Sequence, residues 1–222
     1  MTLTTSLVGN VRPIWDRQLR HPFVQALGDG TLPRENFAFY ILQDALFLDT
    51  LARTFGYAAT VTTDRSEMER FGELLLGTIR DEQALHRAYA HRFGLTSEQM
   101  AATPMAPTTY AYTRHLLATA ATGTLPELLS AILPCFWIYA EVGRHFTSLG
   151  PPAETHPYRD WLATYGSPEF EETGAWLRAA LDRRADDLSA SALQRLQGIF
   201  LISSRYEYIF WDMAWRREEW PI

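Results

Sequence analysis

A carboxylate falls on the apolar face of a predicted helix at residues 35–60. Residues three or four apart share one face of a helix, and Asp44 stands in such a series, which reads Phe37, Tyr40, Asp44, Phe47, Leu51 and Phe55. Asp49 lies off this face and precedes Arg53 by four residues, a spacing typical of a surface pair. The pattern therefore predicts a buried carboxylate at Asp44 and a solvated one at Asp49.

A second carboxylate, Glu207, lies on the apolar face of a predicted helix at residues 190–217. That face reads Leu193, Leu196, Phe200, Ser203, Glu207, Phe210 and Ala214. A buried carboxylate loses its solvation, so it must be paired, hydrogen-bonded or kept protonated. Each of the two acids therefore serves either a structural hydrogen bond or proton transfer, and the presence of two favours chemistry.

The single cysteine, Cys135, lies on a third apolar face. This face comprises Leu128, Ala131, Cys135, Ile138, Val142 and Phe146, with Tyr139 one turn beyond the thiol. Pro134 removes a backbone donor inside the helix, so we expect a kink beside the sulfur. A lone cysteine is commonly a small buried apolar side chain, but it becomes a nucleophile where a carboxylate or phenol assists its deprotonation. The spacing alone leaves both roles open.

Two glutamate–histidine pairs have the spacing of metal ligands on a helix. Glu82 precedes His86, and Glu141 precedes His145, by four residues. Helical di-iron proteins need ligands from four helices, with Glu-x-x-His repeated, but the last 66 residues contain no histidine. We therefore expect hydrogen bonds along each helix and no metal site. His21 is expected at a turn or helix start, without a chemical role.

The composition excludes several chemistries. The 222 residues include twenty basic side chains, all of them arginine, and one cysteine. Without lysine there is no Schiff base, no pyridoxal-phosphate linkage and no P-loop lysine, and one cysteine forms no internal disulfide, zinc finger or iron–sulfur cluster. The net charge of −6 argues against a nucleic-acid surface, which needs a clustered basic footprint.

Long segments with helical periodicity alternate with short glycine- and proline-containing breaks. The segments are 35–60, 65–93, 127–148, 169–187 and 190–217. Ser97, Ser167 before Pro168, and Ser189 are capping signals at helix starts. We therefore predict an all-α protein of about eight to ten helices, in a single domain at 1–222. No repeat or linker-like shift in composition divides it.

The sequence gives no sign of a membrane or a secretory route. The first residues lack a basic start followed by an apolar run, so no signal peptide is expected. No stretch approaches 18 uninterrupted apolar residues, so no membrane span is expected. A cytoplasmic protein is the corresponding expectation.

Four segments, in chain order and at matching spacing, resemble the signatures of the TenA/thiaminase II family. The first begins at His21-Pro-Phe and includes Gln43-Asp-Ala-Leu-Phe-Leu. The second is Pro134-Cys-Phe-Trp-Ile-Tyr, and the third is an aromatic block at 158–170. The fourth is Tyr206-Glu-Tyr-Ile-Phe-Trp-Asp-Met-Ala. The resemblance extends over nearly the whole chain.

This resemblance implies an all-α, heme-oxygenase-like helical bundle that assembles as a homotetramer and uses no metal, heme or other cofactor. Members of the family hydrolyse thiamin or its degraded aminopyrimidine and release hydroxymethylpyrimidine for thiamin salvage and biosynthesis. The expected ligand is therefore a small pyrimidine or thiamin, with no nucleic-acid or membrane partner.

The resemblance also implies a role for each matching residue. It places the nucleophile on Cys135, the carboxylate that binds the pyrimidine on Asp44, and the acid/base group on Glu207. Asp44 is also a catalytic candidate, because a carboxylate can help to deprotonate the thiol. Aromatic residues of the binding pocket fall on Phe47, Tyr112, Tyr139 and Tyr165, with Tyr110 as the alternative to Tyr112. One group in the family lacks the cysteine, and Cys135 places this chain in the cysteine-containing group.

Three functions are compatible with these features. The first is hydrolysis of 4-amino-5-aminomethyl-2-methylpyrimidine to 4-amino-5-hydroxymethyl-2-methylpyrimidine through a covalent cysteine adduct, with thiamin as a second candidate substrate. The second is a non-catalytic thiamin- or pyrimidine-binding or regulatory protein of the same fold, although a binding protein has no need of the thiol. The third, a metal-dependent oxygenase, is disfavoured because the C-terminal segment has no histidine.

Overall fold

The computed structural model describes the backbone of residues 2–222, and all their side chains except those of 81–83 and 97. Within this part of the chain there are eleven α-helices, one π-helical turn and one short 3₁₀ helix, and no strand. The all-α prediction is confirmed, but the expected number of helices was too low. Helices of six to eight residues, such as α2 (Pro22–Asp29), α6 (Ser97–Ala102) and α9 (Arg159–Tyr165), contain too few turns to show a period.

The chain forms two compact units, and each unit is built from two separate segments. Unit 1 comprises Met1–Leu32 and Leu129–Trp211, and unit 2 comprises Pro33–Leu128 and Asp212–Ile222. Two long helices, α8 (Leu125–Ser148) and α11 (Ala190–Arg216), contribute residues to both units. That residues 1–222 form a single domain stays a prediction.

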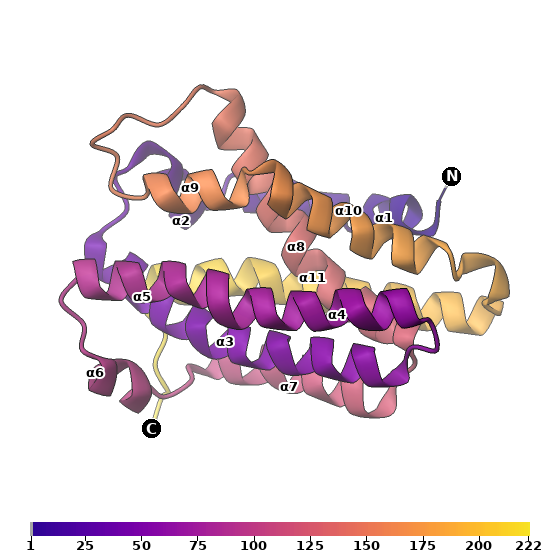
Figure 1. Ribbon diagram of the computed structural model, residues 1–222. Coiled ribbons are helices and arrows are strands. Elements are labelled where there is room, and N and C mark those ends of the chain that lie inside the picture. The colour runs from indigo at the N-terminus through magenta and orange to yellow at the C-terminus, as the bar shows by residue number, and fades with distance from the viewer. Residues whose placement is uncertain (1) are drawn as a thin grey trace. The chain divides into compact units, whose positions relative to one another are not determined.

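Unit 2 is organised around its longest helix, α3 (Arg34–Val61). One side of α3 contacts α4 (Arg65–Gly77) and α5 (Gln83–Arg92), and another side contacts α7 (Pro107–Thr122), as Figure 1 shows. Because neighbours cover α3 on more than one side, apolar side chains are buried around much of it, including Phe37, Tyr40, Ile41 and Phe55. The buried position predicted for Asp44 is therefore part of a broad core.

A π-helical turn at Thr78–Glu82 joins α4 to α5. The prediction of one continuous α-helical period over 65–93 is therefore wrong at this turn, although the segment is α-helical on both sides of it. A π turn bonds i to i+5, which takes up one residue more than an α turn. Two α turns span about seven residues, and the extra residue makes eight, the separation between the buried Thr78 and His86.

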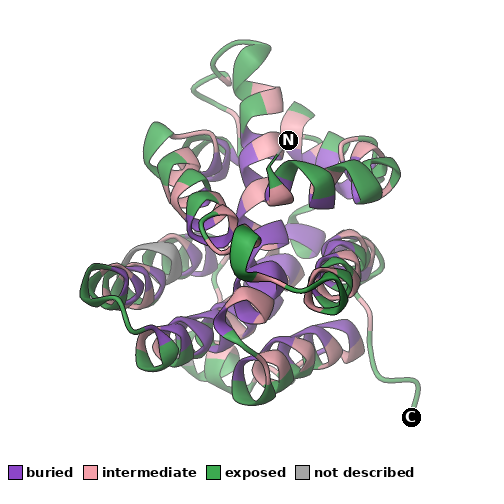
Figure 2. Cartoon of the chain, turned by 90° about the vertical axis from the view of Figure 1, so that its right-hand side faces the viewer, coloured by how far each residue is buried: buried purple, intermediate pink, exposed green. Residues whose placement is uncertain are grey.

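Unit 1 contains α1 (Leu3–Gln18), α2, α9, α10 (Pro168–Asp182) and most of α8 and α11. Trp15 of α1 contributes to its core: its ring lies 5.4 Å from that of Trp137 and 5.9 Å from that of Phe200. Its indole nitrogen donates to the Ser204 hydroxyl at 3.1 Å. Figure 2 shows the corresponding division of the helices into buried and exposed faces.

The helix ends follow most of the predicted capping signals. Ser167 caps α10 and accepts a hydrogen bond from the Phe170 amide, and Ser189 accepts one from the Ala192 amide at the start of α11. The prediction for α6 was one residue late, because the cap is Thr96, in a capping box with Gln99.

Two predicted helices also differ in detail. The segment predicted at 169–187 divides into α10 and a 3₁₀ turn at Ala185–Asp187. Helix α8 continues through Pro134 without a break, so the kink stays a prediction. His21 caps α2 by accepting the Phe23 amide on Nδ1, which confirms its expected place at a helix start.

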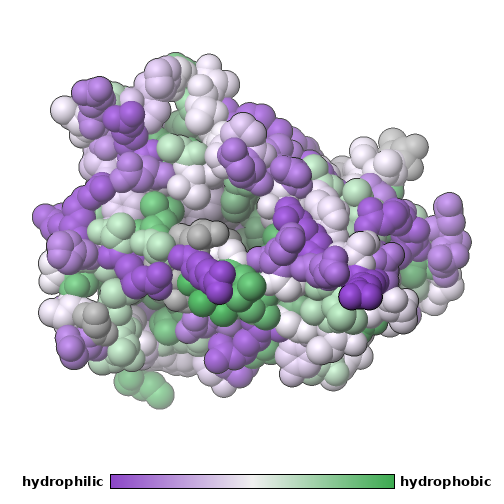
Figure 3. Space-filling model, in the orientation of Figure 1, coloured by the Kyte–Doolittle hydropathy of each residue, from purple (hydrophilic) through white to green (hydrophobic). Residues whose placement is uncertain are grey.

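Among the described residues, α8 alone has the length and apolar character of a membrane span. Of its most apolar stretch, 72% is buried inside the protein, and core helices of proteins without membrane spans have the same composition. On the face of the molecule in Figure 3, charged and apolar side chains are interspersed, and apolar ones gather over the junction of α4 and α5.

Candidate active site

Asp44 lies on α3 and its side chain is only 5% exposed. Two donors reach the same oxygen, Oδ2: the Tyr40 hydroxyl at 3.0 Å and His86 Nε2 at 2.7 Å. Tyr40 stands one turn earlier on α3, whereas His86 comes from α5 and is fully buried. The predicted burial of Asp44 is confirmed, and the cost of burying its charge is offset by hydrogen bonds from two helices.

Two further residues of the expected site, Phe47 and Tyr112, lie against each other in unit 2. Their ring centroids are 4.9 Å apart with an interplanar angle of 37°, and both side chains are buried. Phe47 lies three residues after Asp44, on the same side of α3. Tyr110, the alternative to Tyr112, is 47% exposed and its ring lies 6.2 Å from that of Trp220. The structure therefore favours Tyr112 as the aromatic neighbour of Phe47.

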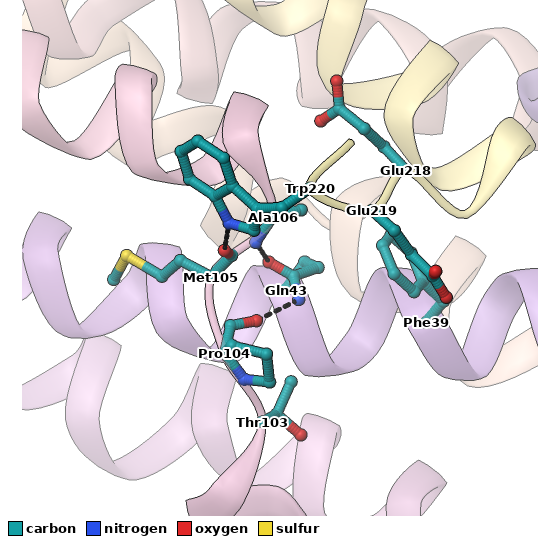
Figure 4. Close-up of a pocket in the computed structure, with 9 residues that line it drawn as sticks. All are labelled: Phe39, Gln43, Thr103, Pro104, Met105, Ala106, Glu218, Glu219 and Trp220. Carbon is teal, nitrogen blue, oxygen red and sulfur yellow. Dashed lines mark hydrogen bonds between the residues drawn. The ribbon is translucent and has the colours of Figure 1, made fainter. Parts of the chain in front are cut away.

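A hydrogen-bonded connection at Gln43 fixes the segment that leads into α7. Gln43 is buried, accepts the Ala106 amide and donates to the Pro104 carbonyl, both at 2.9 Å. Figure 4 shows these bonds at the edge of a surface hollow of about 390 Å³, where the Trp220 indole donates to the Met105 carbonyl. None of the seven predicted site residues lines this hollow. Because Gln43 bonds the backbone at both Pro104 and Ala106, it holds the start of α7 beside α3.

The other four predicted site residues lie in unit 1, where aromatic rings surround Tyr139 of α8. Its ring centroid is 4.9 Å from that of Tyr165 at the end of α9 and 4.9 Å from that of Trp211 on α11. Trp161 completes the cluster, with its ring 4.5 Å from that of Tyr165. Cys135 is half-buried and precedes Tyr139 by one turn of α8. The thiol therefore lies on the face of α8 that carries the aromatic cluster.

Helices α8 and α11 contact each other on both sides of Cys135 and Glu207. The Ser130 hydroxyl donates to the Leu196 carbonyl at 2.8 Å, and nine residues later Tyr139 packs on Trp211. The two helices therefore run in the same direction, and the α8 segment between these contacts includes Cys135, while the α11 segment between them includes Ser203 and Glu207. Glu207 is 2% exposed, which confirms its predicted burial.

Gly143 allows the close approach of α8 to the end of α9. A Cβ atom at this position would overlap the backbone carbonyl of Tyr165 and the amide nitrogen of Gly166. The absence of a side chain thus permits backbone contact, and this contact sets Tyr165 beside Tyr139. A helical glycine is normally unfavourable compared with alanine, so close packing explains its place here.

Two members of the predicted glutamate–histidine pairs contact residues on other helices. His86 bonds Asp44, and Glu141 lies 3.5 Å from Arg12 Nη1 in an ion pair. The side chain of Glu82 lies outside the described residues. Across the described side chains, no group of three or more His, Cys, Asp or Glu has the arrangement of a metal site.

His86 is the residue near the expected site that the sequence pattern missed. It was considered only with Glu82, four residues earlier on its own helix. The π turn shifts the buried face of α5 by one residue relative to α4. An uninterrupted α-helical period continued from α4 therefore does not predict that His86 faces α3. The informative signal is its burial, which only the structure shows: His86 is 0% exposed, and a buried histidine needs a hydrogen-bond partner.

The helical architecture has counterparts among solved structures. One is a domain with a heme oxygenase-like fold from Shewanella denitrificans, 14% identical, with a TM-score of 0.65 over 96% of this chain and 92% of that one. Another is a TenA homologue from P. horikoshii, 33% identical, with a TM-score of 0.89 over 97% of this chain and 99% of that one. The chain is therefore an all-α protein of the heme-oxygenase-like fold class.

The sequence comparisons identify the family. Residues 9–217 match the model of the TENA/THI-4/PQQC family. A protein of Halalkalibacterium halodurans named aminopyrimidine aminohydrolase is 41% identical over 221 residues, which cover 99% of this chain and 98% of that protein. The chain belongs to the TENA/THI-4/PQQC family, and its resemblance to TenA proteins is confirmed.

Proposed function

We propose that this protein is a thiamin-salvage hydrolase that converts 4-amino-5-aminomethyl-2-methylpyrimidine to 4-amino-5-hydroxymethyl-2-methylpyrimidine, with thiamin as a second substrate. The observation that carries this proposal is the full-length similarity to a protein named aminopyrimidine aminohydrolase. The buried positions of Asp44 and Glu207 agree with it, because such carboxylates are characteristic of sites that bind ligands or move protons.

Unit 2 supplies the groups that would bind the pyrimidine ring. An aminopyrimidine is flat and carries an exocyclic amine, so it needs aromatic surfaces and a hydrogen-bond acceptor. Phe47 and Tyr112 provide the aromatic surfaces, and Asp44 provides the acceptor. As the family resemblance implies, Tyr139 and Tyr165, whose rings lie 4.9 Å apart, are the other aromatic residues proposed for substrate binding.

The proposed reaction divides the displacement into two covalent steps. The Cys135 thiolate forms a C–S bond to a ring carbon, and the C–N bond at the exocyclic methylene breaks as Glu207 protonates the leaving amine to ammonia. Water then forms a C–O bond at the methylene and gives a proton to the Glu207 carboxylate. Breakage of the C–S bond restores the aromatic ring and the thiolate. With thiamin, the leaving group is the thiazole.

The proposal is tested by steady-state kinetics on both substrates, with the pyrimidine product identified by mass spectrometry. Ammonia release identifies turnover of the aminopyrimidine, and thiazole release identifies turnover of thiamin. We expect Cys135→Ser and Glu207→Gln to abolish turnover while the folded structure is kept. Full activity in either variant would contradict the corresponding role. Stoichiometric binding without any product would instead favour a binding or regulatory protein.

The same proposal includes the setting in which the enzyme works. As the family resemblance implies, we propose a cytoplasmic homotetramer without metal or other cofactor. Metal analysis of the purified protein, together with activity after chelation, tests the last point. A stoichiometric metal that is required for turnover would contradict it and favour an oxygenase or another metal-dependent reaction.

A further inference from the structure

We propose that His86 is a positioning residue, which orients Asp44 so that its second oxygen, Oδ1, accepts the exocyclic amine of the pyrimidine. This inference rests on the proposed function and extends it to a residue outside the set that sequence resemblance assigns. His86 lies on α5 and its side chain has no exposure, so it acts through Asp44 and has no surface for a substrate.

The hydrogen-bond pattern makes His86 the donor. The Tyr40 hydroxyl and His86 Nε2 both lie within hydrogen-bond distance of Asp44 Oδ2. An ionised carboxylate only accepts hydrogen bonds, so Nε2 must carry the proton. At 2.7 Å this is the shorter of the two bonds, as expected for a donor to a charged acceptor. The two donors, from α3 and α5, together fix the orientation of the Asp44 carboxylate group.

The same pattern leaves the other oxygen of Asp44 available. The hydrogen bonds that described residues donate to Asp44 both end on Oδ2. Among the described residues, the one solvent-inaccessible side-chain polar atom without a hydrogen-bond partner is Nη1 of Arg178. Asp44 Oδ1, which accepts neither of these two bonds, therefore remains accessible to solvent. A carboxylate that is fixed through one oxygen and open at the other has the arrangement needed to accept an amine N–H in a defined direction.

The π turn explains how His86 comes to face Asp44. It adds one residue between α4 and α5 and returns His86 to the buried face that Thr78 also occupies. Tyr89, three residues after His86, packs its ring 4.9 Å from Phe37 of α3 and holds α5 in place. Single π turns inside α-helices occur frequently at functional sites, which agrees with a positioning role.

The test compares three substitutions that differ in where they place a donor. The amide nitrogen of glutamine reaches the position of Nε2, that of asparagine reaches the position of Nδ1, and leucine has no donor. We expect His86→Leu and His86→Asn to raise KM for the aminopyrimidine roughly 10- to 100-fold with little change in kcat, because the amine contact is lost equally from bound substrate and transition state. We expect His86→Gln to stay within about threefold of the wild type.

A second measurement avoids turnover altogether. Calorimetric titration with the product, 4-amino-5-hydroxymethyl-2-methylpyrimidine, should show the same order of affinities: wild type and His86→Gln above His86→Asn and His86→Leu. In an Asp44→Asn background, His86→Leu should cause no further loss, because residues that act through one another are not additive. His91→Leu, at an exposed position of the same helix, is the matched control and should bind like the wild type.

The outcomes separate this inference from the proposed function. If the wild type turns over neither substrate and does not bind the product, the proposed function is wrong. If the wild type is active but glutamine, asparagine and leucine weaken binding equally, in parallel with a loss of thermal stability, His86 is structural and the inference is wrong. Additive effects of Asp44→Asn and His86→Leu would overturn it as well.

Discussion

Asp44 and Asp49 stand five residues apart on α3 and have opposite surroundings. Asp44 is buried beneath two donors, whereas Asp49 is exposed and its backbone carbonyl accepts a hydrogen bond from Arg53 at 2.9 Å. The two side chains therefore form a matched pair, with the same chemical group on the same helix. They allow the effect of a buried carboxylate on ligand binding to be separated from the general effect of removing a charge.

We expect Asp44→Asn to weaken product binding by about 1.5–3 kcal/mol, roughly 10- to 100-fold, because it removes a hydrogen bond to a charged group. Asp49→Asn should leave binding unchanged. Calorimetric titration with the hydroxymethylpyrimidine product measures both variants. Equal affinities for Asp44→Asn and the wild type would remove Asp44 from the binding site.

His115 makes stability depend on pH. Burial lowers the pKa of its imidazole below the ordinary value of 6.5. The unfolded chain therefore holds this proton at a higher pH than the folded chain does, and stability rises with pH between the two pKa values. The contribution from His115 is complete above pH 6.5 and is lost as the pH falls towards the lower, folded value.

We expect the wild-type Tm to fall between pH 7.5 and pH 5.5 and to fall less in His115→Gln, which cannot be protonated. His91→Gln, at an exposed position, serves as the control and should keep the wild-type dependence. Thermal unfolding at several pH values measures the difference. Identical pH profiles for His115→Gln and the wild type would show that His115 does not contribute.

At the residue scale, the sequence predicted which carboxylates are buried, but it did not predict what they bond to. Three- and four-residue spacing was enough to assign Asp44 and Glu207 to apolar faces, since one helix determines its own buried side. The bond from His86 to Asp44 joins α5 to α3, across 42 residues of chain. Such a pairing depends on how two helices pack, and the period of either helix contains no information about it.

Among the helices, α8 contains a glycine, Gly143, that is required by close packing against α9. Glycine in a helix normally costs about 0.5–1 kcal/mol relative to alanine. Gly198 of α11, also inside a helix, has no atom near the position that a Cβ would occupy. The same substitution should therefore have opposite effects at the two positions.

We expect Gly143→Ala to lower the stability by about 1–3 kcal/mol, because its Cβ would force the backbone at Tyr165 away from α8. Gly198→Ala should raise the stability by about 0.5–1 kcal/mol through helix propensity. Denaturant unfolding of both variants measures these values. A Gly143→Ala variant as stable as Gly198→Ala would show that α9 is not held against α8 by this close approach.

Apolar periodicity predicts the long helices well but does not predict the π turn between α4 and α5. The segments predicted at 35–60 and 190–217 correspond closely to α3 and α11, because each has a long uninterrupted pattern. The π turn at Thr78–Glu82 was missed because helical residues lie on both sides of it and a one-residue shift is small compared with the variation in any apolar pattern. Such a shift becomes visible only when the partner helix is known.

At the scale of the whole molecule, the exposed apolar residues of unit 2 bear on the proposed tetramer. Met68, Leu76 and Ile79 are each nearly half exposed and follow one another along α4 and the π turn. Their spacing of eight and three residues keeps them near one face of the helix. Apolar side chains gather over this junction in Figure 3, as expected for a surface that another copy of the chain covers.

We expect light scattering to give a mass of about 102 kDa, four times the 25.4 kDa chain. Met68→Glu together with Leu76→Glu should reduce this mass, because two buried charges would be left unpaired at the contact. Ile202→Glu, at a similarly exposed position of unit 1, should leave it unchanged. A monomeric wild type would contradict the proposed tetramer, and an unchanged mass in the double variant would place the interface elsewhere.

The interleaving of the two units has a consequence for how the chain acquires its structure during synthesis. Helices α1 and α2 belong to unit 1, yet Ser204, to which Trp15 donates, is synthesised only after the whole first segment of unit 2. At 5–20 residues per second, the ribosome needs about 5–20 s for that segment. During this interval α1 and α2 lack the native partners that the second segment of unit 1 supplies, such as Ser204. We therefore expect chaperones to bind the early chain. Unit 1 can complete its fold only after its second segment, Leu129–Trp211, has been synthesised.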